Sequence, residues 1–207
     1  IIDVPNNTLI TSTLNQNNYT SGDKINVSAQ AYDGTNYSAF NWSSTITVLD
    51  LTNPLVFNLV PIINTNYNTS QSIEISANVT EGIGISSVNV NITYSNGTSQ
   101  IINLINTIGN KYNTSFIISN LTGRYNLTFF ANDTSNNINN TETTYFNVLD
   151  NQNPIVFDLK PIANSTYNLS QSIEISANIT DNVAVSSVLA NLTYPNGTTQ
   201  QLTLSLA

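Results

Sequence analysis

The sequence of 207 residues contains no cysteine, no histidine and no methionine. Without cysteine the chain can form no disulfide and offers no thiolate ligand. Without histidine it lacks the side chain that most often serves as a general base or as a metal ligand. Serine and threonine are plentiful, but they lack a base partner for nucleophilic catalysis, and the 12 acidic residues are scattered. The composition therefore argues against an enzyme, and we expect no catalytic residue.

Charged side chains are also scarce. Only 8% of the residues are charged, and four basic residues stand against 12 acidic ones, for a formal net charge of −8. A chain so poor in lysine and arginine has no electrostatic footprint for nucleic acid or for an anionic membrane surface. No apolar run reaches the roughly 20 residues that span a bilayer. We therefore expect no nucleic-acid partner and no membrane span in this segment.

The start of the sequence carries neither an initiator methionine nor a signal peptide. A mature secreted chain loses both when its leader is removed. We therefore expect either a processed start or the edge of a longer polypeptide.

Asparagine, in contrast, is unusually frequent. It occupies 37 positions, and 19 of these begin an Asn-x-Ser/Thr sequon in which x is not proline. Chance pairing with the 50 serine and threonine residues would give roughly nine such motifs. An AT-rich genome, which inflates the use of asparagine, isoleucine, serine and threonine, is the alternative to selection for N-glycosylation. The predicted acceptors are Asn6, Asn18, Asn26, Asn36, Asn41, Asn68, Asn78, Asn91, Asn96, Asn113, Asn120, Asn126, Asn132, Asn139, Asn164, Asn168, Asn178, Asn191 and Asn196.

A repeat with a period of 100 residues organises the sequence. Residues 50–106 match residues 150–206 at 32 of 57 positions without a gap, and residues 20–50 align in the same register with residues 120–150. A period of this length is long for a solenoid unit and typical of a small all-β domain. A unit of about 100 residues can also bury a core of its own.

The repeat register also fixes the expected domain boundaries. The first residues, IIDV at 1–4, align with IINL at 101–104, so the sequence begins in the middle of a unit. We predict the back half of one unit at 1–50, a complete unit at 51–150 and the front half of another unit at 151–207.

Alternating apolar and polar residues predict seven strands in the complete unit. No segment carries an apolar stripe of helical period. Seven short strands in about 100 residues are the pattern of an antiparallel sandwich of two sheets. The predicted fold is therefore all-β. The expected strands are residues 55–59, 73–80, 88–94, 101–104, 112–118, 125–131 and 143–148.

Three segments of the repeat, LDNQNPIVFDLKP, SIEISANITD and GRYNLTFFANDTSNN, resemble tandem immunoglobulin-like domains of prokaryotic surface proteins. The chain is most similar to the fibronectin type III and cadherin-like repeats of archaeal surface-layer or filament glycoproteins. The resemblance covers essentially the whole chain and implies tandem immunoglobulin-like sandwiches on the outside of a cell. It also places Tyr125 at a tyrosine corner, a position that Ile25 occupies in the first unit.

Strand geometry bears on the sequons, because residues i and i+2 of a strand point to the same face. In the sequons that begin at Asn78, Asn91, Asn126 and Asn178, the middle residue is apolar and falls on the core side of its predicted strand. The acceptor asparagine should therefore face outward, where a glycan does not enter the core. Glycans there would also mask sheet edges that carry few charges.

Acidic residues mark the expected boundaries between units. The segments LDLTNP and LDNQNP resemble the linkers of calcium-binding cadherin-like repeats, and hard oxygen ligands of this kind suit Ca²⁺. The alternative is that these residues close turns at strand ends. The candidate calcium ligands are Asp50, Asp133, Asp150 and Asp181.

Aromatic residues are the remaining candidates for recognition. Trp42, the only tryptophan, lies inside a sequon, and Tyr67 and Tyr167 fall in predicted loops or strand edges. Such rings could stack on sugars, or they could cap the sandwich. The sequence leaves this choice open.

Together these features predict a structural, extracellular and N-glycosylated repeat protein that forms a cell-surface filament, a stalk or a surface-layer element. No cofactor is expected apart from the possible calcium and the covalent glycans. The alternative function is an adhesin that binds carbohydrate or cells. The expected partners are other copies of the chain in a head-to-tail filament, either because half-units of neighbouring chains exchange strands or because the polypeptide continues beyond both ends.

Overall fold

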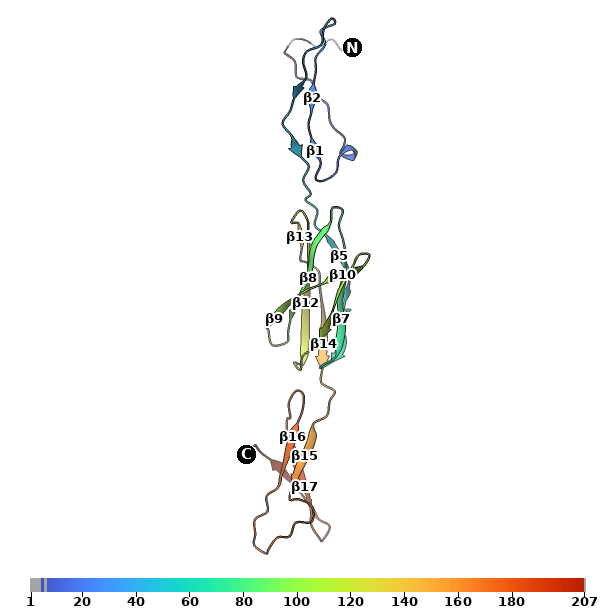
Figure 1. The fold of residues 1–207 in the computed structure, drawn as a ribbon. Helices are drawn as coiled ribbons and strands as arrows, with labels where there is room; N and C mark the ends of the chain where they lie inside the picture. Colours follow the sequence, from blue (N-terminus) through green and yellow to red (C-terminus); the bar gives the residue numbers. More distant parts are fainter. Residues whose placement is uncertain (1–4, 6, 207) are drawn as a thin grey trace.

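The structure, a computed structural model, describes residue 5 and residues 7–206 of the chain. Three units built from β-strands follow one another along the molecule, with the best-formed one in the middle (Figure 1). The described residues contain one turn of 3-10 helix, η1 (Gln16–Asn18), and no α-helix. None of their helical segments is long and apolar enough to cross a membrane. The IIDV motif at 1–4 and the acceptor Asn6 lie outside the described residues.

The middle unit is a sandwich of two sheets. One sheet has the strand order β10-β11-β7-β5, and the other has the order β6-β14-β12-β8-β9, with β13 paired to β12. The strands are β5 (Leu55–Val60), β6 (Thr65–Asn68), β7 (Ser72–Thr80), β8 (Ile85–Thr93), β9 (Ser99–Asn103), β10 (Ile105–Ile108), β11 (Lys111–Ile117), β12 (Gly123–Asp133), β13 (Ile138–Asn139) and β14 (Thr143–Leu149).

The strand order is that of an immunoglobulin-like domain. The first, second and fifth of the seven strands predicted from the sequence, β5, β7 and β11, share one sheet, while β8, β12 and β14 share the other. All pairs are antiparallel except β6 with β14, because the chain crosses from one sheet to the other between β5 and β6. The all-β, immunoglobulin-like fold predicted from the sequence is therefore confirmed.

Alternation along the strands builds the core of this sandwich. Val79, Ile92 and Leu127, the middle residues of three sequons, are buried as their strand parity predicts. Burial of so many aliphatic and aromatic side chains is the main source of stability in a unit without disulfides. The buried apolar set is Val56, Ile73, Ile75, Ala77, Val79, Val88, Val90, Ile92, Leu104, Phe116, Ile118, Tyr125, Leu127, Phe129, Ala131, Phe146 and Val148.

Tyr125 forms the tyrosine corner expected from the sequence. Its fully buried ring lies 5.1 Å from the ring of Tyr94 and 5.0 Å from that of Phe146, measured between centroids. Its hydroxyl donates to the carbonyl oxygen of Leu121 at 2.9 Å and lies 2.8 Å from the Ser119 hydroxyl. Burial raises the pKa of the phenol. The bond ties the start of β12 to the loop before it.

The first unit is a small open arrangement of β1 (Lys24–Ile25), β2 (Ser28–Ala29), β3 (Asn41–Trp42) and β4 (Ile46–Thr47). Strand β1 pairs with β4 in the register of β12 with β14, so Ile25 faces Ile46 where Tyr125 faces Phe146. The structural match does not extend upstream, because η1 occupies the positions that copy the end of strand β11.

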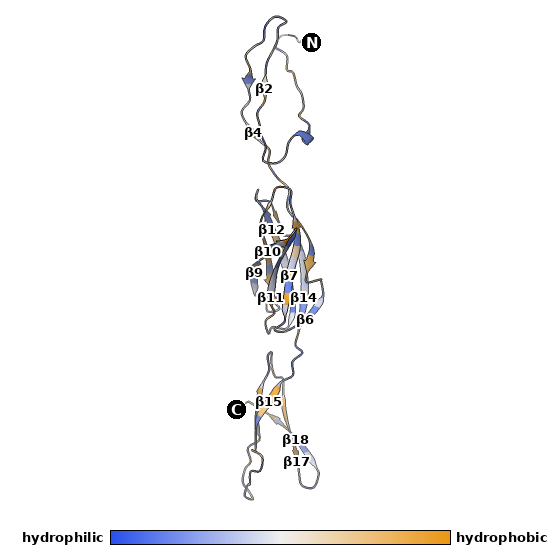
Figure 2. Ribbon diagram, turned by 45° about the vertical axis from the view of Figure 1, so that its right-hand side comes forward, coloured by the Kyte–Doolittle hydropathy of each residue, from blue (hydrophilic) through white to orange (hydrophobic). Residues whose placement is uncertain are grey.

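The third unit contains β15 (Ile155–Lys160), β16 (Ser176–Thr180), β17 (Val188–Thr193) and β18 (Thr199–Leu204). Strands β15 and β16 pair in the register of β5 with β7, and β17 and β18 pair in the register of β8 with β9. Figure 2 shows apolar residues along β15. In this unit the copies of the core residues of the middle sandwich are half-buried or exposed, and none of them is buried.

An identical stretch of sequence shows how much the missing half matters. The segment SQSIEISAN occurs at 70–78 and again at 170–178. In the first copy strand β7 begins at Ser72 and pairs with β11, whereas in the second copy β16 begins only at Ser176. The local sequence is the same, so the difference comes from the partner strand that the third unit lacks among the described residues.

Candidate functional site

The junction before the middle sandwich gathers several of the residues predicted to be functional. Here the linker that carries Asp50 enters the sandwich beside the turn that follows β12. Fully buried Asp133 organises this turn: its Oδ1 accepts from the backbone N–H groups of Ser135 and Asn137, each at 2.8 Å. Its Oδ2 accepts from the Asn137 amide nitrogen, also at 2.8 Å. A buried carboxylate is tolerated because these donors satisfy both of its oxygens.

The same turn holds the linker in place. The Asn137 amide nitrogen also donates to the carbonyl oxygen of Asp50 at 3.2 Å. Two residues later, the Asn139 amide nitrogen donates to the carbonyl oxygen of Pro54 at 2.9 Å, and the Pro54 ring is fully buried. Because each bond joins a side chain to the backbone of the linker, the two asparagines form a clamp that fixes the linker to the sandwich.

The Asp50 carboxyl has a less complete set of partners. Its Oδ1 accepts from the Thr52 backbone at 3.1 Å and from the Thr52 hydroxyl. The Thr52 hydroxyl is the main reason that the pKa of Asp50 lies below its usual value, and the Thr52 backbone N–H lowers this pKa further. The other oxygen, Oδ2, is buried and has no hydrogen-bond partner among the described residues.

The residues at this junction do not present the oxygen shell that calcium takes. Ca²⁺ binds six to eight oxygens, but N–H donors already occupy both Asp133 oxygens, which leaves Asp50 Oδ2 as the free carboxylate atom. Among the described residues, no three acidic side chains gather at one place. Calcium at the junction stays a prediction, which a rise in melting temperature on calcium addition would test.

The other predicted ligands lie at the following junction. Asp150 Oδ1 accepts from the backbone of Gln152 at 3.1 Å. Asp181 Oδ1 accepts from the backbone of Val183 at 2.8 Å, while its Oδ2 is buried without a partner among the described residues. The four predicted ligands are therefore divided between two junctions, and each is engaged in closing its own turn.

One side-chain hydrogen bond crosses the second junction. The Asn182 amide nitrogen donates to the hydroxyl of Thr69 at 2.8 Å. Thr69 is buried, and its backbone donates to the carbonyl oxygen of Leu149 at 3.1 Å. The contact limits the freedom of the third unit relative to the middle one, because Leu149 directly precedes the linker.

The sequon asparagines stay out of the core wherever the structure describes them. In the complete sandwich Asn96, Asn120 and Asn126 are exposed, while Asn68, Asn78, Asn91, Asn113, Asn132 and Asn139 are half-buried. The acceptor atom of N-glycosylation is the side-chain amide nitrogen. In Asn139 this nitrogen donates to the carbonyl oxygen of Pro54, and a glycan on it would have to replace this bond.

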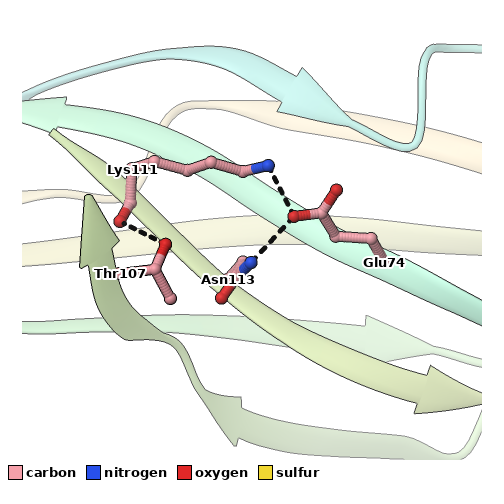
Figure 3. A network of polar contacts seen from close by, with 4 residues as sticks. All are labelled: Glu74, Thr107, Lys111 and Asn113. Carbon is pink, nitrogen blue, oxygen red and sulfur yellow. Dashed lines mark hydrogen bonds and ion pairs between the residues drawn. The ribbon is translucent and has the colours of Figure 1, made fainter. Parts of the chain in front are cut away.

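A polar cluster on β7 and β11 engages another sequon. Figure 3 shows Glu74 between two donors: its Oε1 lies 2.6 Å from the Lys111 ammonium nitrogen and 2.9 Å from the amide nitrogen of Asn113. The hydrogen bond from Lys111, with that from Asn113, lowers the pKa of the Glu74 carboxyl. Nearby, the Thr107 hydroxyl donates to the carbonyl oxygen of Lys111 at 3.4 Å. The cluster links β7 and β11 on the exposed face of their sheet, and it engages the side-chain nitrogen of Asn113 that would carry a glycan.

The predicted recognition aromatics divide into two kinds. Tyr67 packs edge-on against Phe146, with ring centroids 5.5 Å apart, so it caps the sandwich. Trp42 is exposed and lies 6.3 Å from the ring of Phe40, while Tyr167 is exposed in the open third unit. Only the exposed rings could stack on a sugar.

Sequence reasoning missed the two asparagines of the junction clamp, Asn137 and Asn139, as structural residues. Asn139 was predicted only as a glycan acceptor, and Asn137 was not singled out. Their signal is weak because asparagine is so frequent in this chain. A usable sign was their place in the first residues after the conspicuous AND motif that ends at Asp133, where a turn must meet the linker.

Comparisons with known proteins yield structural likenesses alone. No family model matches the chain, and no curated protein matches it. Among solved structures, it is similar to the fibronectin(III)-like modules of Clostridium thermocellum CbhA, with 15% identity over 47% of this chain and all of that one and a TM-score of 0.37. It is also similar to the SrpA adhesin of Streptococcus sanguinis, with 14% identity, 74% and 94% coverage and a TM-score of 0.35.

A third solved structure is a tetra-tandem repeat from the extending region of a large adhesion protein. The identity is 19% and the TM-score is 0.42; the likeness covers 90% of this chain and 46% of that one. At such values the assignment of the fold rests on the strand order and the tyrosine corner described above.

Proposed function

We propose that the chain is a structural, N-glycosylated segment of an extracellular repeat protein. Its sandwiches would act as spacers in a cell-surface filament, a stalk or a surface-layer element, and no catalysis is assigned to it. The middle unit buries a core of its own, so that reach is gained by adding units rather than by enlarging one of them.

The observation that carries this proposal is the placement of the sequons on the complete sandwich. Nine sequons begin within residues 55–149, and none of their acceptor asparagines is buried. The middle sandwich has a closed core, so its acceptor asparagines are accessible because they lie on the outward faces of the strands or in loops. Glycans at these sites would add a polar coat to a surface with few charges.

A glycan-binding assay distinguishes a spacer from an adhesin. A glycan array probed with the purified 207-residue chain should show no binding above background if the units are spacers. Reproducible binding to one glycan class, abolished by Trp42→Ala, would overturn the spacer proposal in favour of an adhesin.

The second candidate function, carbohydrate or cell binding, is favoured by a specific feature of the first unit. Exposed Tyr32 and Tyr37 contact each other there as a tilted pair with ring centroids 4.5 Å apart, near the pair of Phe40 and Trp42 in sequence. The complete unit has asparagine or glutamate at the equivalent positions. Exposed aromatic rings of this kind are suitable platforms for sugars, so the Trp42→Ala variant is the decisive control.

A further inference from the structure

The third unit exposes an apolar face that its own described residues do not cover. A groove of about 420 Å³ opens on this face. Most of the apolar side chains that line it copy core residues of the middle unit. Among the residues that line it are Val156, Leu159, Ile175, Ile179, Val188 and Leu192.

Comparison of the two copies shows what the face lacks. Val56 is 2% exposed in the middle unit, while Val156 is 52% exposed, although β5 and β15 pair in the same register with their neighbours. In the middle unit β5 lies against β12 and β14. Among the described residues the third unit thus has no counterpart of the β12–β14 hairpin, while its two strand pairs keep the registers of the middle unit.

A matching hairpin is present at the other end of the chain. The first unit pairs β1 with β4 in the register of β12 with β14. Its residues at the core positions are apolar throughout, and the side chains of Val27 and Ile46 are exposed instead of buried. The positions that copy the core residues of β12 and β14 are Ile25, Val27, Ala29, Ala31, Ile46 and Val48.

We propose that residues 24–49 of one chain supply the counterpart of the β12–β14 hairpin to the third unit of a second copy by strand complementation. Strand β17 of one chain would pair with residues 24–33 of the next, as β8 pairs with β12, and main-chain hydrogen bonds would carry the contact. Closure within a single chain is disfavoured because the complete sandwich lies between the two open units (Figure 1). The contact is head-to-tail, so it propagates into a filament.

This assembly deepens the filament form of the proposed function and is tested separately from it, on the full chain produced without glycans. Cysteines are introduced at a pair that copies Asn126 and Thr93, which are opposite each other on β12 and β8. In Asn26→Cys/Thr193→Cys, oxidation should give a ladder of multiples of 22.5 kDa on a non-reducing gel. The control Asn26→Cys/Leu192→Cys places the two thiols on opposite faces of the sheet and should give at least a tenfold weaker ladder.

Two substitutions on β15 test the same contact by light scattering. Ile155 and Val156 are both exposed in the chain, at 64% and 52%, but their copies differ: Leu55 stays 60% exposed in the complete sandwich and Val56 is buried. Val156→Asp should therefore abolish the oligomers, whereas Ile155→Asp should leave their mass unchanged. A wild-type chain that stays at 22.5 kDa, a disulfide confined to one chain, or equal ladders from the two cysteine pairs would each overturn strand complementation. None of these results would touch the glycosylated spacer.

Discussion

At the scale of single residues, hydrogen bonds from side chains to backbone carry much of the architecture. Tyr125 anchors the loop before β12, and Asn137 and Asn139 hold the linker at the first junction. Each of these groups is at least half-buried. Removal of one donor leaves a carbonyl oxygen unpaired, and the cost rises with the burial of that oxygen.

Tyr125→Phe should destabilise the middle unit by about 1–2 kcal/mol, because the ring still fills the core while the Leu121 carbonyl oxygen loses its donor. Tyr94→Phe is the matched control, since its hydroxyl bonds to Gln100 at the surface and should cost less than about 0.5 kcal/mol. Hydrogen exchange of the β12 amides measures both values on the full chain. Equal protection in the two variants would contradict the role of the corner.

Glu74 should make a small contribution to stability that depends on pH. Its pKa is lowered in the folded chain by Lys111 and Asn113, so the contribution is present above the unfolded pKa and is lost as the pH falls through the folded pKa. Both side chains of the ion pair are more than one third exposed, so solvent screening keeps the value below about 1 kcal/mol.

The measurement is the melting temperature of the middle unit between neutral and acidic pH, for the wild type and for Glu74→Gln. The two curves should differ at neutral pH and converge in acid. Ser72→Ala, which removes a surface hydroxyl on the same strand, is the control and should keep the wild-type pH dependence. Curves for Glu74→Gln and the wild type that stay parallel down to the acid limit would contradict the assignment.

At the scale of elements, the turns between strands depend on a few glycines. Gly97 and Gly123 both have positive φ, +84° and +112°, but only Gly123 is crowded: a Cβ there would lie 2.9 Å from the Cβ of Ser95. Gly97→Ala should cost about 1 kcal/mol from backbone strain alone. Gly123→Ala should cost about 2–3 kcal/mol, since the clash adds to a strain of the same kind. Urea denaturation of the full chain, monitored by hydrogen exchange of the β12 amides, measures the loss of stability in each variant. The loss should be larger for Gly123→Ala than for Gly97→Ala.

The sequence predicts the long strands of the complete unit and fails on the short ones. Strands β7, β8 and β12 show alternation over many residues, and their core residues follow from parity. Strand β6 was missed because its four residues, TNYN, are polar apart from Tyr67 and gain order from β14. Strand β10 was missed because it is exposed along its whole length, so no face of it is apolar against a polar one.

The junction is only partly readable from the sequence. The structure places Asp50 and Asp133 beside the same turn, where Asn137 contacts both of them, and the pKa of Asp50 is lowered there chiefly by the Thr52 hydroxyl. The sequence does not show which asparagines of the turn bind the linker, because this depends on which of several neighbouring side chains points toward it. Composition alone makes those asparagines equivalent.

At the scale of the whole molecule, each unit depends on having both of its halves. The identical segment at 70–78 and 170–178 is a nine-residue match with two different outcomes, and the copy without partner strands leaves its apolar side chains in solvent. Only the middle unit has a closed core among the described residues. The stability of the first and third units therefore depends on which strands cover their apolar faces. The properties of the surface depend on whether the outward asparagines carry glycans.

Glycopeptide mass spectrometry of native material tests the central claim, an extracellular N-glycosylated spacer, most directly. The account predicts hexose-bearing peptides at exposed sequons of the middle sandwich, with Asn126 and Asn96 occupied and with occupancy at Asn139 at least about tenfold lower, because its amide nitrogen holds the linker. Unmodified asparagine at all of these sites, or full occupancy at Asn139 in a folded chain, would contradict it.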